Sequence, residues 1–447
     1  MAAPPVLPDD LIEEILLRLP PDDPASLLRA SAVCQTWGSV VSRPSFRRRI
    51  HELHRTPPVL GFLDDWYDEH VPDFFPTTAT AFSYAAPDRR VWWALDCRHG
   101  RALFISKARG GAPELLVWEP VTGRQRRVSV PAAFGRSYLN AAVFCAADAC
   151  DHRDCQCHGG PFRVAFVFAG DTDDLERIGV LACVYSSDTS TWGEVTSTHG
   201  EFCMDGTYYL GRCHFMDFTY YSSVLAGRSL LYFISDDALI VEYDLARNEL
   251  TVIDTPETEN ESKFVLMLAE DGGLGLIQDL DSHLQLWSMQ RNDRTDARWI
   301  LSQIIDLHIF LPVDALVNAE CSLFVLGFAE GANVIFVNTD AGLFTIELLS
   351  KRARKVCGSN GFLQVVPVVG FYTPVSRNRN QGLPLSNARV EERGEEEEKT
   401  GDQAQQLFDN QPNAIKEGTL LTSSNVSAMS SDLDDSGKYV IPCSSTP

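Results

Sequence analysis

A short β pattern recurs through the middle of this 447-residue chain and constrains its fold more than any other feature. Alternating apolar strands end in an aromatic or acidic residue, and a polar turn then leads into a second strand. Five segments follow this plan: residues 115–128, 181–192, 238–250, 284–299 and 343–356. Most of them have another apolar run upstream. Three or four strands per unit, repeated in this way, predict an all-β propeller of six or seven blades.

The first 57 residues have the periodicity of helices instead. Apolar residues recur at intervals of three and four, which predicts one helix face made of Leu11, Ile12, Ile15, Leu16 and Leu19. We predict a second helix from Asp23 to Cys34, and a third that carries Trp37 and ends before Pro44. Three helices in about forty residues cannot bury this much apolar side chain among themselves, so something else must cover part of it.

Composition divides the chain into three regions. Residues 376–447 are rich in Ser, Asn, Gln and Glu, contain few aromatic residues and show no periodicity. Such a segment cannot bury enough apolar surface to fold, so we predict that it is disordered and dispensable. The predicted class is an α+β multidomain protein: a small three-helix domain over residues 1–57, a β-propeller over 58–375 and a disordered tail over 376–447.

Charge excludes some partners. The chain has 38 Lys and Arg against 61 Asp and Glu, a net charge of −23, and residues 58–375 carry −18 of it. General affinity for nucleic acid requires positive charge, so we expect no nucleic-acid partner. The N-terminus lacks the pattern of a secretory signal, and we expect no membrane partner either. The twelve cysteines should then be reduced thiols, in the cytoplasm, the nucleus or both.

Three motifs in the helical region, taken in order, resemble an F-box. They are LPDDLIEEILLRL at residues 7–19, LLRASAVCQTW at 27–37 and RPSF at 43–46. The middle region looks like the propeller-type C-terminal part of the large plant F-box family, especially its grass members. This second resemblance rests on residues 117–123 (VWEPVTG), 184–187 (VYSS) and 370–374 (GFYTP).

The resemblance implies a substrate receptor that catalyses nothing itself and needs no cofactor. F-box helices dock on the Skp-type adaptor of a cullin–RING ubiquitin ligase, and the downstream domain captures a protein substrate, here unknown. The motif match assigns nine positions to adaptor docking: Leu7, Pro8, Leu11, Ile15, Leu16, Leu19, Leu27, Val33 and Trp37. Helix spacing alone cannot separate these positions from the small core that the helices must also form.

Two other functions stay open at this point. One is a propeller scaffold that binds the adaptor without delivering a substrate. The other is a propeller hydrolase, for which Glu119, Asp188, Asp244 and Glu347 would be the carboxylates. These four occupy equivalent turn positions in different repeats, which favours a role in capping turns.

A cysteine-rich segment is the one candidate metal site. Cys150, His152, Cys155 and His158 could supply four ligands to zinc, which prefers sulfur and nitrogen in a tetrahedral arrangement. The segment lacks the paired Cys-x-x-Cys spacing of a zinc knuckle. We therefore favour a loop with free thiols and expect no bound metal.

Overall fold

The computed structural model describes residues 7–64, 73–77, 92–106, 113–119, 123–134, 139–147, 160–169, 180–198, 222–234, 239–258, 263–280, 282–293, 296–315, 323–358, 362 and 364–371. The chain divides into two units, residues 1–384 and 385–447, and all described residues belong to the first. The predicted disordered tail lies outside the described residues, as do Cys150, His152, Cys155 and His158.

Four helices form the N-terminal module: α1 (Asp9–Leu17), α2 (Pro24–Ser31), α3 (Gln35–Ser42) and α4 (Pro44–His54). Two of the helices begin at a proline. This position suits proline because the N–H of a first-turn residue has no acceptor within the helix. Pro24 and Pro44 are the first residues of α2 and α4. The structure therefore adds a fourth helix to the three expected, since Pro44 ends one helix and begins the next.

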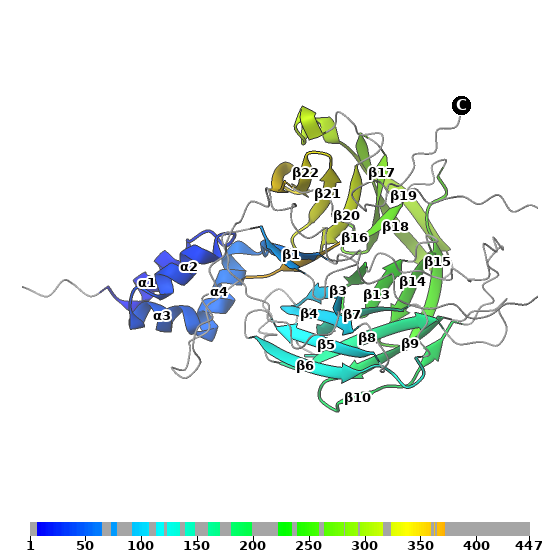
Figure 1. The fold of residues 1–447 in the computed structure, drawn as a ribbon, viewed down its shortest axis with the longest axis horizontal. Coiled ribbons are helices and arrows are strands. Elements are labelled where there is room, and N and C mark those ends of the chain that lie inside the picture. The colour runs from blue at the N-terminus through cyan, green and yellow to red at the C-terminus, as the bar shows by residue number, and fades with distance from the viewer. Residues whose placement is uncertain are drawn as a thin grey trace, which may run out of the picture. The chain divides into compact units, whose positions relative to one another are not determined.

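Six antiparallel sheets follow the helices (Figure 1). Blade 1 consists of β1 (Val59–Asp64), β2 (Asp73–Pro76) and β24 (Val365–Val369). Blade 2 consists of β3 (Trp92–Arg98), β4 (Arg101–Ser106), β5 (Glu114–Glu119) and β6 (Arg124–Ser129). Blade 3 consists of β7 (Leu139–Cys145), β8 (Phe162–Ala169), β9 (Val180–Ser186), β10 (Thr191–Trp192) and β11 (Thr196–Ser197).

The second half continues in the same way. Blade 4 consists of β12 (Ser223–Ala226), β13 (Leu230–Ile234), β14 (Leu239–Asp244) and β15 (Glu249–Asp254). Blade 5 consists of β16 (Phe264–Leu268), β17 (Leu274–Leu280), β18 (His283–Asp293) and β19 (Asp296–Asp306), followed by short 3-10 turns η1 (Leu307–Ile309) and η2 (Val313–Ala315). Blade 6 consists of β20 (Phe324–Ala329), β21 (Val334–Thr339), β22 (Gly342–Glu347) and β23 (Arg352–Cys357).

The ring is closed by strands from its two ends. The first strand, β1, pairs with the last, β24, so that Phe62 lies opposite Pro367 and Leu63 opposite Val366. Blade 1 is therefore built from both ends of the domain. This closure removes two sheet edges that would otherwise be open, and it confirms the predicted propeller, with six blades.

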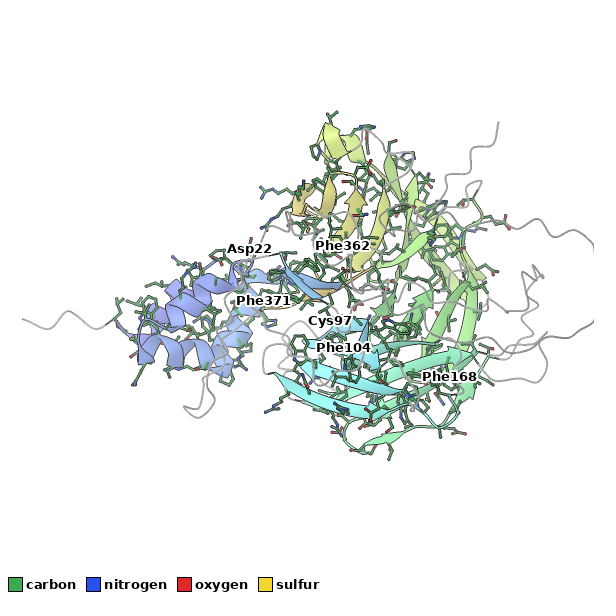
Figure 2. The ribbon with its side chains drawn as sticks, viewed as in Figure 1. Asp22, Cys97, Phe104, Phe168, Phe362 and Phe371 are labelled. Carbon is green, nitrogen blue, oxygen red and sulfur yellow. The ribbon has the colours of Figure 1, made fainter. Side chains whose placement is uncertain are left out.

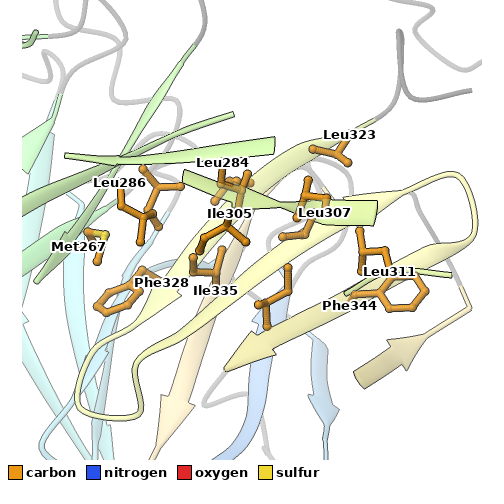
Figure 3. Close-up of a cluster of buried hydrophobic side chains, with 14 of the residues drawn as sticks. Met267, Leu284, Leu286, Ile305, Leu307, Leu311, Leu323, Phe328, Ile335 and Phe344 are labelled. Atoms are coloured by element: carbon orange, nitrogen blue, oxygen red, sulfur yellow. The ribbon is translucent and has the colours of Figure 1, made fainter. Parts of the chain in front are cut away.

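Apolar side chains fill the space between each pair of neighbouring blades. The described residues form six such clusters, one at each junction around the ring. The cluster between blades 5 and 6 contains Met267, Leu284, Phe328, Ile335 and Phe344 (Figure 3). These residues occupy alternate positions on their strands, which is why a two-residue sequence period predicted the architecture.

A recurring hairpin explains the sequence repeat. In blades 2, 3 and 6 the N–H at the end of the turn donates to a carbonyl four residues earlier: Gly123 to Glu119, Ser190 to Ser186 and Lys351 to Glu347, at 2.8, 2.9 and 2.9 Å. The donor has a left-handed backbone each time, with φ of 71°, 59° and 54°. Asn248 has the same conformation in blade 4, with φ of 56°. The last residue of the strand and the polar turn that follows it thus define one structural unit.

The closing strand provides a test of the ring. Val366, on β24, is buried between blades 1 and 2. Val366→Asp should lower the free energy of unfolding by at least about 3 kcal/mol, because it buries an unpaired carboxylate. Urea unfolding followed by tryptophan fluorescence measures the change. Gln303→Glu, which adds a carboxylate at an exposed position of β19 opposite Leu286, should change it by about 0.5 kcal/mol at most. Equal midpoints for the two variants would contradict the expectation.

Candidate functional site

The helical module has a core of its own. Its buried side chains include Ile12, Leu16, Leu17, Leu27, Val40, Val41, Phe46 and Ile50. Leu16 and Leu27, two of the nine positions assigned to adaptor docking, therefore lie inside the module. Leu19 and Trp37 are half-buried and pack against the same core. These four side chains support the module's surface from within or from its border.

The other five assigned positions lie on the outside. Leu11 and Ile15 are 52% and 45% exposed on α1, Leu7 is 45% exposed just before it, and Val33 is 66% exposed after α2. Pro8 is also exposed. Leu11 and Ile15 are four residues apart on α1, so they lie on one face of the helix, and Leu7 is exposed just before its start. We call Leu7, Leu11 and Ile15 the aliphatic stripe.

Ion pairs hold α1 against the rest of the module. Arg49 of α4 pairs with Glu13 at 3.0 Å and also with Glu14. The hydrogen bond that Arg49 donates to Glu13, and then the one that it donates to Glu14, raises the pKa of Arg49 above its usual value. Arg43 pairs with Asp9 at 2.6 Å. These contacts lie beside the buried face of α1, so they fix which of its faces is presented outward.

One residue of the module's core comes from the far end of the propeller. Phe371, two residues beyond β24, is 5% exposed and belongs to the core of the helices (Figure 2). Its ring centroid lies 4.4 Å from that of His51, with the rings tilted by 58°. Gly370 donates a backbone hydrogen bond to Pro58 at 3.1 Å. The strand that closes the ring thus also completes the helical core.

The propeller has a buried charged cluster at its inner strands. Arg98 of blade 2 donates through Nη2 to the carbonyl and to Oγ of Ser223 in blade 4, both at 2.8 Å. The same nitrogen lies 3.5 Å from Glu330, which follows β20 in blade 6. Asp96 lies 3.1 Å from Nε of Arg98 and accepts the backbone N–H of Val143 in blade 3 at 2.8 Å. Burial raises the pKa of Asp96 to about 6, against the lowering effect of Arg98.

The candidate hydrolase carboxylates lie in four different blades. Asp244 caps its own turn by accepting the N–H groups of Ala246 and Arg247 at 3.1 and 3.2 Å. Glu119 pairs with Arg101, and Glu347 accepts the hydroxyl of Ser350. Asp188 is exposed in the turn after β9. Their observed roles are those of turn and strand residues.

The described residues contain no group of three or more Cys, His, Asp and Glu that could hold a metal ion. Of the cysteine-rich segment they include only its start, where Cys145 is buried at the end of β7. No helix among them is long and apolar enough to cross a membrane.

Comparisons with known proteins match both parts of the chain. Residues 5–49 match the F-box domain, and residues 93–375, more than half of the chain, match the family described as F-box protein AT5G49610-like, beta-propeller. A search of curated proteins found no match. A similar solved structure is titled "Crystal structure of BBS1N in complex with ARL6DN, soaked with mercury", at 8% identity over 67% of this chain and 74% of that one, with a TM-score of 0.30. Together, an F-box and this type of propeller support a role in SCF-type substrate reception in general terms.

Phe371 gives a test of the link between the two parts. Phe371→Ala should lower the opening free energy of amides in α1 and α4 by about 3 kcal/mol, because it leaves a cavity in a small core. Hydrogen exchange measured on the full chain by mass spectrometry reports this. Phe324→Ala removes a phenylalanine that is 45% exposed on β20, and it should leave exchange in the helices unchanged. Unchanged exchange in the Phe371 variant would disprove the link.

The buried cluster predicts a pH dependence. The pKa of Asp96 is higher in the folded chain than the usual 3.8, so the folded state binds this proton more tightly. As the pH falls from 6 towards 4, the wild type should therefore gain stability relative to Asp96→Asn, by up to about 3 kcal/mol. The gain is lost as the pH rises through 6. Urea unfolding of both proteins across this range measures it, and a constant difference would count against the assignment.

Proposed function

Because the chain belongs to the F-box protein AT5G49610-like β-propeller family, we propose that it is the substrate-recognition subunit of a Skp–cullin–F-box ubiquitin ligase. The helical module would dock on the Skp-type adaptor, and the propeller would recruit a protein substrate for ubiquitination. The chain itself would catalyse no reaction and would need no cofactor. We propose that it acts in the cytoplasm, the nucleus or both; the closer likeness to grass members stays a prediction.

The aliphatic stripe is the observation that carries this proposal. Leu11 and Ile15 stay about half exposed although the core beneath them is complete. Because each side chain is already about half buried, covering the rest of it would contribute about half of the roughly 1.5–3 kcal/mol of full burial. An exposed apolar row on a small module is typical of a surface that a protein partner covers.

We propose different roles for the nine assigned residues according to their burial. Leu7, Pro8, Leu11, Ile15 and Val33 are exposed and would contact the adaptor directly. Leu19 and Trp37 would contribute from the border, whereas Leu16 and Leu27 would act by holding the helices in place. The assignment of docking to all nine residues remains a prediction.

Charged substitutions in the aliphatic stripe test the proposal. Leu11→Asp with Ile15→Asp should weaken binding of a Skp-type adaptor by more than about 100-fold, because two carboxylates would replace buried apolar contacts. Isothermal titration calorimetry measures the affinity. Leu53→Asp is the matched control, since Leu53 is 56% exposed on α4 and is not among the assigned positions. The adaptor affinity of this variant should stay within about twofold of the wild-type value.

The same variant separates receptor from scaffold. A receptor with the double substitution should still bind its substrate through the propeller but should no longer promote its ubiquitination in a reconstituted reaction. Wild-type adaptor affinity in the folded double variant would refute the ligase assignment. Intact adaptor binding by the wild type, with no protein ubiquitinated through it, would favour the scaffold.

A further inference from the structure

The outer edge of blade 6 carries a concentration of positive charge. Lys351, Arg352, Arg354 and Lys355 lie within five residues of one another and all are exposed. Lys351 is the last residue of the β22–β23 turn, and the other three lie within the first four residues of β23. In a chain of net charge −23, such a segment stands apart from its surroundings. We call these four residues the basic edge.

Among the described residues, none of the four side chains of the basic edge makes a hydrogen bond or an ion pair. Glu347 lies opposite Arg352 in the β22–β23 register, but its carboxylate accepts the hydroxyl of Ser350 at 2.6 Å. Lys355 has one neighbour of note, the ring of Phe344, whose centroid is 6.0 Å from Nζ.

Blade 2 offers a contrast within the same molecule. Its outer strand, β6, is also rich in arginine, but the arginines there stabilise the fold. Arg126 donates to the hydroxyl of Tyr185, the carbonyl of Ser187 and Oγ of Ser190 in blade 3, at 3.2, 3.0 and 2.9 Å. Arg127 pairs with Glu114 at 3.3 Å. Folding therefore accounts for arginines on β6 and does not account for the cations on β23.

Lys351 also sits in a backbone conformation that suits lysine poorly. Its φ is 54°, and the equivalent turn positions hold Gly123, Ser190 and Asn248. Glycine and asparagine are enriched in the left-handed region, because other side chains crowd the backbone there. Lys351 therefore places a positive charge at a turn position where glycine would be less strained.

The basic edge can receive an extended chain. β23 is the outermost strand of blade 6, with β22 as its partner in the sheet. An outer strand presents unpaired backbone groups along its free side, and an extended peptide can pair with them. Opposite charges on facing strands stabilise such a pair.

We propose that the basic edge binds an extended acidic segment of the protein substrate, added as a strand beside β23. This rests on the proposed function and names the substrate's chemistry. A few charges on an outer strand are enough to discourage aggregation, but that role explains neither Lys351 nor four cations that form no ion pair with any described residue. The acidic remainder of the body repels an acidic segment, which confines binding to this edge.

A direct binding measurement on the full chain tests the proposal. The probe is a fluorescein-labelled peptide of alternating glutamate and valine, followed by fluorescence anisotropy. Wild type should bind it, and binding should weaken as salt rises from about 50 to about 200 mM. Replacing Arg352, Arg354 and Lys355 together by glutamine should reduce affinity at least about tenfold. Arg124→Gln with Arg127→Gln on β6 is the control and should stay within about twofold.

Lys351→Gly separates charge from folding. The substitution should weaken peptide binding about twofold to threefold. The urea midpoint should stay equal to or above that of wild type, because glycine suits the left-handed turn. The proposal is overturned if the triple variant binds as well as wild type, or if wild type does not bind the peptide. Tighter binding of single-stranded DNA of equal charge at this edge would also overturn it.

The two proposals fail separately. Leu11→Asp with Ile15→Asp should bind the peptide with wild-type affinity, and the triple variant of the basic edge should bind the adaptor normally. If the wild-type chain does not bind the adaptor, the ligase assignment is refuted, but the peptide result is unaffected. Loss of peptide binding alone would refute the basic edge as a substrate site.

Discussion

The guanidinium of Arg98 joins parts of the ring that no apolar cluster connects. Each apolar cluster lies between two neighbouring blades. Arg98 of blade 2 instead reaches Ser223 in blade 4 and Glu330 at the end of β20 in blade 6, and so links alternate blades across the inner strands. A buried cation is costly unless its neighbours satisfy it. Asp96 lies on the same strand, whereas Glu330 and the Ser223 carbonyl reach Arg98 only when the ring is closed, and Nη1 of Arg98 stays buried without a hydrogen-bond partner among the described residues. The cluster therefore depends on the closure that it stabilises.

Closure of the ring also determines how the helical module is completed. β24 pairs with β1, and the chain then carries Phe371 into the core formed by Leu16, Val40 and Ile50. One segment therefore closes the propeller and fills the helices. A module of this size gains much from one added aromatic side chain, since small cores bury a small share of their surface. The helical surface proposed to bind the adaptor is thus supported by the domain proposed to bind the substrate.

Local sequence patterns predicted the parts of this fold that local interactions determine. Alternation revealed the strands and the repeated turn, and motif spacing revealed the helices. The two faces of α1 could not be told apart, because Ile12 and Leu16 have the same four-residue spacing as Leu11 and Ile15; contacts with α3 and α4 decide which pair is buried. Arg98 and Ser223 are 125 residues apart in sequence. No local signal identifies such a pair, and the same holds for Phe371 and His51.

The two surfaces proposed as binding sites differ in the physics of their contacts. The aliphatic stripe would bind through burial of apolar area, which depends little on ionic strength. The basic edge would bind through exposed charges, which salt screens within about 10 Å at 0.1 M. A ligase subunit needs a lasting contact with its adaptor and a reversible contact with each substrate. Apolar burial on the helical module and exposed charge on an outer strand match those two requirements, because truncating apolar contacts chiefly speeds dissociation, whereas surface charge chiefly raises the rate of encounter.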